Sequence, residues 1–90
     1  MENWEIKISK SILKDLDKVE KSYLFQIKSA VNNLALNPFP ENVKKLKGKS
    51  DLILRIRVGQ YRIVYLVDLK KKTITILGIS HRQSSYKRDI

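Results

Sequence analysis

The sequence predicts an α+β fold whose elements follow the order β-α-α-β-β-β. Three observations predict it: one short alternating segment near the N-terminus, two consecutive segments with apolar residues at helical spacing, and three β-rich segments separated by short turns. Strands joined by short turns pair antiparallel, and the helices must bury their apolar stripes against the sheet. We therefore expect a mostly antiparallel twisted sheet with a helical hairpin packed on one face.

The first predicted strand covers residues 3–8, where every second residue is apolar: Trp4, Ile6 and Ile8. A helix follows, which Ser9 or Ser11 can cap because a serine hydroxyl accepts a hydrogen bond from a free N–H of the first turn. Its apolar residues recur at helical spacing: Ile12, Leu13, Leu16 and Val19.

The second predicted helix begins near Ser22, which can serve as its cap. It ends at Asn37-Pro38, because the residue before a proline avoids the helical region. Very few residues separate the two helices, so they should form an antiparallel hairpin. The apolar stripe of the second helix consists of Leu24, Ile27, Val31 and Leu34.

A basic connector over residues 38–50 leads to the three predicted strands, over residues 52–58, 61–68 and 73–80. Gly59-Gln60 fits a two-residue type II′ turn, which pairs Val58 with Tyr61 and Arg57 with Arg62. Paired side chains share a face. Leu54, Ile56, Val58, Ile63 and Tyr65 should therefore meet the helices, and Arg55, Arg57 and Arg62 should lie together on the other face.

Two readings of this arginine cluster stay open. Opposed like charges destabilise a sheet, which suggests that the cluster binds an anion, and the planar guanidinium matches phosphate well. The alternative is a solvated face that only keeps the sheet soluble. A shift of the register by one residue would remove the cluster altogether.

Composition supports a polyanionic partner. The chain has 90 residues, enough for one domain over residues 1–90, and a formal net charge of +10. Nucleic acid is the first expected partner, and an acidic protein or an anionic membrane the second. The absence of cysteine and the single histidine exclude thiolate and histidine-rich metal sites, so no cofactor is expected. No signal peptide or long apolar run is present, which favours a cytoplasmic protein.

The C-terminal segment adds groups that suit metal-independent RNA cleavage. His81, Arg82 and Tyr86 fall within six positions. Attack by a 2′-hydroxyl needs a base, an acid and cations for the charge on the phosphorane. His81 can exchange protons near neutrality, and cations could lower the pKa of Tyr86. Two of these residues also have ordinary interpretations. His81 could be a polar residue at a strand end, and Tyr86 could pack on the core.

These segments resemble the RelE/ParE toxins of type II toxin–antitoxin systems. The resemblance covers nearly the whole chain and is densest in VKKLKG (43–48), LRIRVGQYRIVY (54–65) and ISHRQSSYK (79–87). It implies the β-α-α-β-β-β fold and, for the RelE branch, an mRNA interferase that cleaves mRNA in the ribosomal A site. The resemblance implies catalytic roles for Arg62, His81, Arg82 and Tyr86, and RNA-binding roles for Arg55 and Arg57. Some ribonuclease relatives carry a glutamate base on the hairpin, which this chain lacks.

The resemblance also implies partners and leaves alternatives. The expected partners are the ribosome, mRNA and an acidic or amphipathic antitoxin that wraps the toxin, with DNA contacted only through the antitoxin and no membrane. From charge alone, looser contacts with RNA backbone are expected at Lys44, Lys45, Lys47 and Lys49. Two other functions remain open: a ParE-like inhibitor of DNA gyrase, which lacks the ribonuclease residues, and a basic RNA-binding family member without activity.

Overall fold

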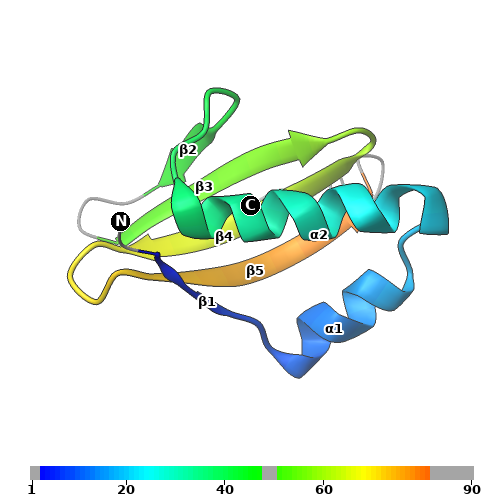
Figure 1. Cartoon of the computed structure of the whole chain (residues 1–90), viewed down its shortest axis with the longest axis horizontal. Helices are drawn as coiled ribbons and strands as arrows, with labels where there is room; N and C mark the ends of the chain where they lie inside the picture. The colour runs from blue at the N-terminus through cyan, green and yellow to red at the C-terminus, as the bar shows by residue number, and fades with distance from the viewer. Residues whose placement is uncertain (1–2, 48–50, 82–90) are drawn as a thin grey trace.

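The computed structural model describes residues 3–47 and 51–81, which form five strands and two helices (Figure 1). The predicted α+β class is confirmed, with one strand more than expected. In chain order the elements are β1 (Glu5–Lys7), α1 (Lys10–Asp17), α2 (Lys21–Leu36), β2 (Lys44–Lys47), β3 (Asp51–Val58), β4 (Tyr61–Asp68) and β5 (Thr73–His81).

The strands form one sheet in the order β1-β5-β4-β3-β2. All neighbouring strands run antiparallel except β1, which pairs with β5 in parallel. In Figure 1, α2 crosses in front of the sheet and α1 lies beyond its lower edge. Both helices contribute to one core with the same face of the sheet, so the prediction of helices packed on one face is confirmed.

The core follows the apolar periodicity of the sequence. Burial alternates strictly along β4, as expected for a strand with one face against helices. The fully buried residues include Ile27 and Leu34 of α2 and Ile63, Tyr65 and Val67 of β4. The stripe of α1 is narrower than the sequence suggested: among the described core residues, its buried members are Ile12 and the following Val19.

Some predicted boundaries change. The side chain of Ser9 caps α1, accepting a hydrogen bond from the N–H of Ile12 at 3.4 Å. The prediction of Ser22 as a cap is wrong, because α2 begins at Lys21 with Glu20 as its N-cap. The N–H of Glu20 donates to the hydroxyl of Tyr61 at 3.2 Å, so a contact with the sheet satisfies a backbone group at this helix start.

The basic connector contains the additional strand. β2 pairs with β3 and forms an edge of the sheet. Lysine is depleted in strands, so the intrinsic preference of this short, lysine-rich segment does not indicate a strand. Lysines are nevertheless common on edge strands, because their charge opposes pairing with another molecule.

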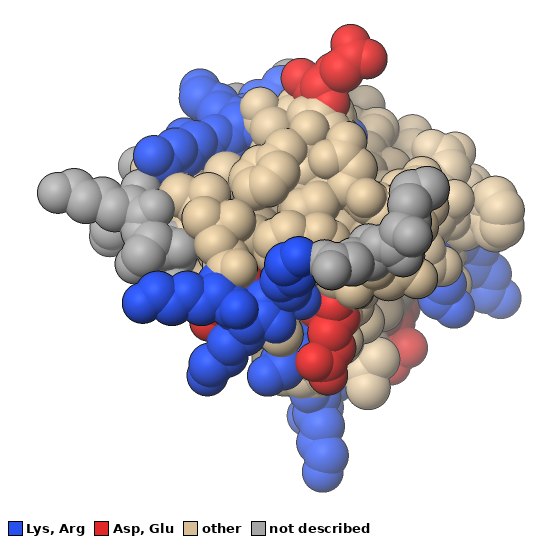
Figure 2. Space-filling model, turned by 60° about the vertical axis from the view of Figure 1, so that its left-hand side comes forward, with Lys and Arg blue, Asp and Glu red and all other residues tan. Residues whose placement is uncertain are grey.

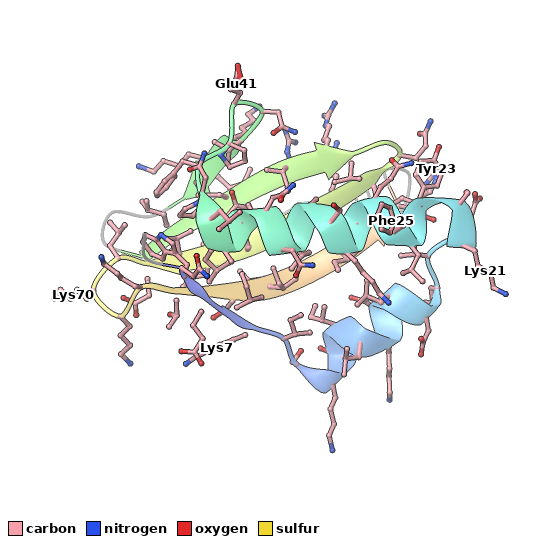
Figure 3. The ribbon with its side chains drawn as sticks, viewed as in Figure 1. Lys7, Lys21, Tyr23, Phe25, Glu41 and Lys70 are labelled. Carbon is pink, nitrogen blue, oxygen red and sulfur yellow. The ribbon has the colours of Figure 1, made fainter. Side chains whose placement is uncertain are left out.

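The β3–β4 hairpin has the predicted register: Val58 pairs with Tyr61 and Arg57 with Arg62, and the same register continues to Leu54 with Tyr65. Gly59 has φ +60°, as the first central residue of a type II′ turn requires. Tyr23, near the start of α2 in Figure 3, packs over this turn, and a Cβ added at Gly59 would lie 2.5 Å from its ring. The hairpin tip is therefore fixed by its own geometry and by α2.

Neither helix in the part of the chain that the structure describes has both the length and the apolar character needed to cross a membrane.

Candidate functional site

The sheet surface opposite the helices carries a set of cations, which we call the arginine face: Lys44, Arg55, Arg57 and Arg62. Cross-strand pairing places them in two adjacent rows. Arg57 pairs directly with Arg62, and Arg55 pairs with Lys44 on one side and Val64 on the other. Because paired residues share a face, four cations from three neighbouring strands lie together there.

Arg55 lies half-buried within this cluster. Burial, followed by the charges of Arg57 and Arg62, lowers the pKa of the Arg55 guanidinium from its ordinary value. Its Nε is buried and has no hydrogen-bond partner among the described residues. Arg55 is thus a partly buried positive group beside two other positive groups, with a donor left unpaired, and a bound anion would stabilise it.

This arrangement can bind a phosphodiester. Guanidinium groups present parallel N–H donors that match two phosphate oxygens, and charge-assisted hydrogen bonds of this kind are stronger than neutral ones. Arg55 and Arg62 are half-buried, whereas Arg57 is exposed. The half-buried pair can hold one phosphate in a defined position. The exposed arginine can contact a neighbouring phosphate of the same backbone.

The predicted RNA-binding lysines divide between two faces. Lys44 pairs with Arg55 and joins the arginine face, whereas Lys45 pairs with Leu54, whose side chain points to the core. Lys47 ends β2 and pairs with Ile53. Lys49 lies outside the described residues.

His81 lies on the other side of the sheet from the arginine face. It pairs with Tyr61 at the end of β5, and the two rings make an edge contact with centroids 5.2 Å apart. Tyr61 in turn contacts Tyr23 of α2, with ring centroids 5.5 Å apart. The structure thus brings Arg55, Arg57 and Arg62 together, but it does not bring His81 to them. Arg82 and Tyr86 lie outside the described residues.

Ser80 is a polar residue of the arginine face that the sequence analysis did not select. It pairs with Arg62, one position before His81. Regular alternation continued from Ile74 and Ile76 would place Ser80 on the core side. The bulge in β5, where the pairing with β4 shifts between Val64 and Tyr65, places it on the arginine face instead, so no sequence signal marked this residue. A hydroxyl beside Arg62 can donate a further hydrogen bond to a bound phosphate.

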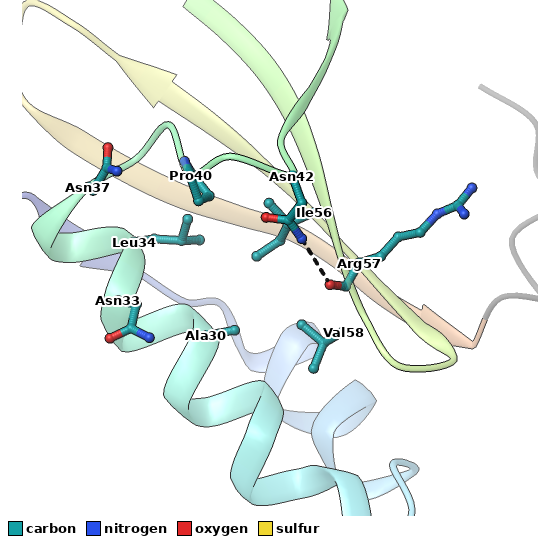
Figure 4. Close-up of a pocket in the computed structure, with 9 residues that line it drawn as sticks. All are labelled: Ala30, Asn33, Leu34, Asn37, Pro40, Asn42, Ile56, Arg57 and Val58. Carbon is teal, nitrogen blue, oxygen red and sulfur yellow. Dashed lines mark hydrogen bonds between the residues drawn. The ribbon is translucent and has the colours of Figure 1, made fainter.

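A pocket of about 260 Å³ lies between α2 and β3 (Figure 4). Its lining is apolar and amide-rich, and the Nδ2 of Asn42 donates to the carbonyl oxygen of Arg57 at 3.3 Å. The guanidinium of Arg57 points away from this pocket. The lining offers no group for proton transfer, and no cluster of three metal-ligating side chains occurs among the described residues, so we place the candidate site on the arginine face.

Comparisons with known proteins agree on one family. A family model described as the ParE toxin of the type II toxin–antitoxin system parDE matches residues 6–86. A Methanocaldococcus jannaschii protein named toxin RelE1 is 37% identical over 87 residues, covering 93% of this chain and 96% of that protein.

Solved structures give the same answer. The archaeal RelE–RelB complex from Pyrococcus horikoshii matches with a TM-score of 0.82 at 32% identity, covering 89% of this chain and 96% of that chain. The RelB–RelE antitoxin–toxin complex from Methanococcus jannaschii matches with a TM-score of 0.72 at 31% identity, covering 93% and 99%. The chain therefore belongs to the RelE/ParE family of toxins of type II toxin–antitoxin systems.

Proposed function

We propose that this toxin is a ribosome-dependent endoribonuclease that cleaves mRNA by attack of a 2′-hydroxyl on the adjacent phosphate. The observation that carries the proposal is the arginine face, where Arg57 directly opposes Arg62 and Arg55 lies beside both. A sheet gains no stability from such a cluster. Binding of a polyanion provides the compensating charge, and the similarity to RelE proteins makes mRNA the expected polyanion.

The chemistry requires no cofactor. The 2′-oxygen bonds to phosphorus as its proton leaves, the bond from phosphorus to the 5′-oxygen breaks, and the leaving oxygen takes up a proton. The products are a 2′,3′-cyclic phosphate and a 5′-hydroxyl. Negative charge grows on the phosphate oxygens in the transition state, and guanidinium groups held in place beforehand stabilise that charge.

Each cation has a part in this proposal. Arg62, between Arg57 and Ser80 in its row, binds the scissile phosphate, and Arg55 and Arg57 hold it and its neighbour. Lys44 lies at the edge of the same face and contacts RNA backbone more loosely.

Two residues are proposed for proton transfer, Tyr86 from the family resemblance and His81 from its chemistry. The family resemblance gives Arg82 a part in stabilising the phosphorane, and it gives Tyr86 the part either of general base or of a ring that stacks on an RNA base. His81 was an equal candidate for proton transfer from its chemistry. Its contact with Tyr61, on the side of the sheet that packs against the helices, favours Tyr86 for this step.

An antitoxin is the proposed protein partner, since the two solved relatives described above are toxin–antitoxin complexes. The net charge of +10 attracts an acidic partner and speeds its association. Figure 2 shows a broad uncharged surface bordered by Lys and Arg, with fewer Asp and Glu side chains. An amphipathic antitoxin segment with acidic residues beside its apolar side would match such a surface.

Inhibition of DNA gyrase is the second candidate, because the matching family model is described by the ParE name. One experiment separates the two. The purified toxin is added to ribosomes carrying a defined mRNA, and 5′ ends are mapped; in parallel, supercoiling by gyrase is assayed. Cleavage within codons and unchanged supercoiling support the proposal, and the reverse result supports the gyrase function.

A further inference from the structure

Gly78 occupies the middle of β5, the orange strand of Figure 1, on the arginine face. It pairs with Val64, which pairs with Arg55, which pairs with Lys44. One row therefore crosses four strands, with two cations at one end and a glycine at the other. The adjacent row contains Arg57, Arg62 and Ser80.

The backbone gives no reason for a glycine at this position. Among the described glycines, Gly59 is the one with positive φ, so Gly78 has a conformation that any residue can adopt. β5 carries a bulge next to it, where the pairing with β4 shifts between Val64 and Tyr65. A bulge needs glycine where its residue is left-handed, which does not apply to Gly78.

Packing gives no reason either. A Cβ added at Gly78 would meet no atom of the described residues within 4 Å, apart from its chain neighbours. Gly59 is the opposite case, since a Cβ there would collide with Tyr23. A glycine inside a strand weakens the strand and often marks a place where a ligand or another backbone approaches closely.

The space beside Gly78 lies close to the cations of the arginine face. Neighbouring strands lie about 4.8 Å apart, so the backbones of Arg55 and Gly78, two strands apart, are separated by about 10 Å. Arg62 is closer, since its partner Ser80 lies two residues from Gly78 on the same face. An anion held by the guanidinium groups would therefore have its adjoining atoms over Val64 and Gly78.

We propose that Gly78 keeps open the place on the arginine face where a nucleotide of the RNA lies flat across β4 and β5, with its phosphate on Arg55 and Arg62. This inference rests on the proposed RNA substrate and adds a residue that determines how the RNA is seated. The half-buried Val64 supplies an apolar floor for the sugar or base, and Ser80 borders it with a hydroxyl. A side chain at position 78 would lift the nucleotide away from the arginines.

The test compares Gly78→Ala and Gly78→Val with wild type in three measurements. These are the melting temperature, the affinity for a short single-stranded RNA whose 2′-hydroxyls are methylated, and cleavage of mRNA on ribosomes. Valine is expected to keep or raise the melting temperature, because it favours strands. It should weaken binding of the methylated RNA at least tenfold and reduce cleavage by a similar factor, with alanine between valine and wild type.

Thr75→Val is the matched control. Thr75 lies on the same face of the same strand but pairs with Leu66, away from the arginine rows. Its variant should bind and cleave as wild type does. If Gly78→Val binds and cleaves RNA as well as wild type does, the inference about Gly78 is wrong, whereas the proposed function is not contradicted. A marked fall in the melting temperature of Gly78→Val would also overturn the inference, since the glycine would then serve packing. Wild-type protein that neither binds nor cleaves RNA would contradict the proposed function itself.

Discussion

The two faces of the β3–β4 hairpin differ in what their cross-strand pairs contribute to stability. On the face toward the helices, Ile56 pairs with Ile63 and both are buried. One position along the chain, on the other face, Arg57 pairs with Arg62. The first pair stabilises the sheet by removing apolar surface from water. The second opposes two like charges and gives no such gain.

This contrast separates stability from function along a single strand. Changes on the helix face should alter folding, and changes on the arginine face should alter RNA cleavage with little cost in stability. Natural proteins break local rules chiefly where a site requires it, which is why we place the site on the arginine face.

Ile63→Ala should have the largest effect on folding. Ile63 is completely buried, and a buried isoleucine truncated to alanine costs about 2–5 kcal/mol of unfolding free energy. Urea unfolding followed by circular dichroism measures the change. Leu66→Ala, on the half-buried opposite face of the same strand, is the control and should lose less than half as much.

Arg62→Ala should leave the fold intact and reduce cleavage on ribosomes by about a hundredfold, the usual loss when one group that stabilises the transition state is removed. Cleavage rate and melting temperature are measured on the same preparation. Lys70→Ala, in the exposed turn at the other end of β4 (Figure 3), should cleave as wild type does. Full activity of Arg62→Ala would remove the arginine face from the mechanism.

Tyr65 should make the fold sensitive to alkali. Burial raises its pKa, and its hydroxyl donates to the carbonyl oxygen of Pro38 at 2.7 Å. The unfolded chain releases this proton near pH 10 and the folded chain does not, so stability is complete below that pH and falls above it, by up to about 1.4 kcal/mol per pH unit. Unfolding measured from pH 8 to 11 should show a steeper loss for wild type than for Tyr65→Phe.

His81→Gln tests whether His81, at the end of β5, stabilises the fold or transfers a proton. Loss of the ring contact with Tyr61 should cost about 1 kcal/mol of stability. Cleavage at a temperature where the variant is folded should stay close to wild type, far from the roughly hundredfold loss expected of a proton-transfer group. A loss of that size, together with a changed pH profile, would return the role of acid or base to His81.

Arg57→Thr should have the smallest effect on the stability of the fold, and it should raise the stability rather than lower it. Removing one of two opposed charges and adding a β-branched residue should raise stability by about 0.5 kcal/mol. RNA affinity should fall. The slope of log affinity against log salt concentration should also become shallower, by the amount expected for the loss of about one phosphate contact. A stable Arg57→Thr with unchanged RNA binding would favour the reading of a merely solvated face.

The hairpin was predictable because its determinants are local. Gly59-Gln60 sets the turn, the turn sets the register, and alternation then divides apolar from basic residues. The lysine-rich β2 was missed because intrinsic preference argues against it, and only pairing with β3 makes it a strand. Glu20 rather than Ser22 is the helix cap, and the hydroxyl of Tyr61, 41 residues away, accepts a hydrogen bond from its N–H, a contact that no local pattern reveals.

By itself, the sequence determined the class of fold, the charge and the pairing of Arg57 with Arg62, since periodicity and turn chemistry act over a few residues. Only the tertiary structure decided which side of the sheet His81 joins, how the cations of three strands form rows, and that no described atom would contact a side chain at Gly78 beside them. These depend on strands brought together across the chain, where a shift of one position moves a side chain to the other face.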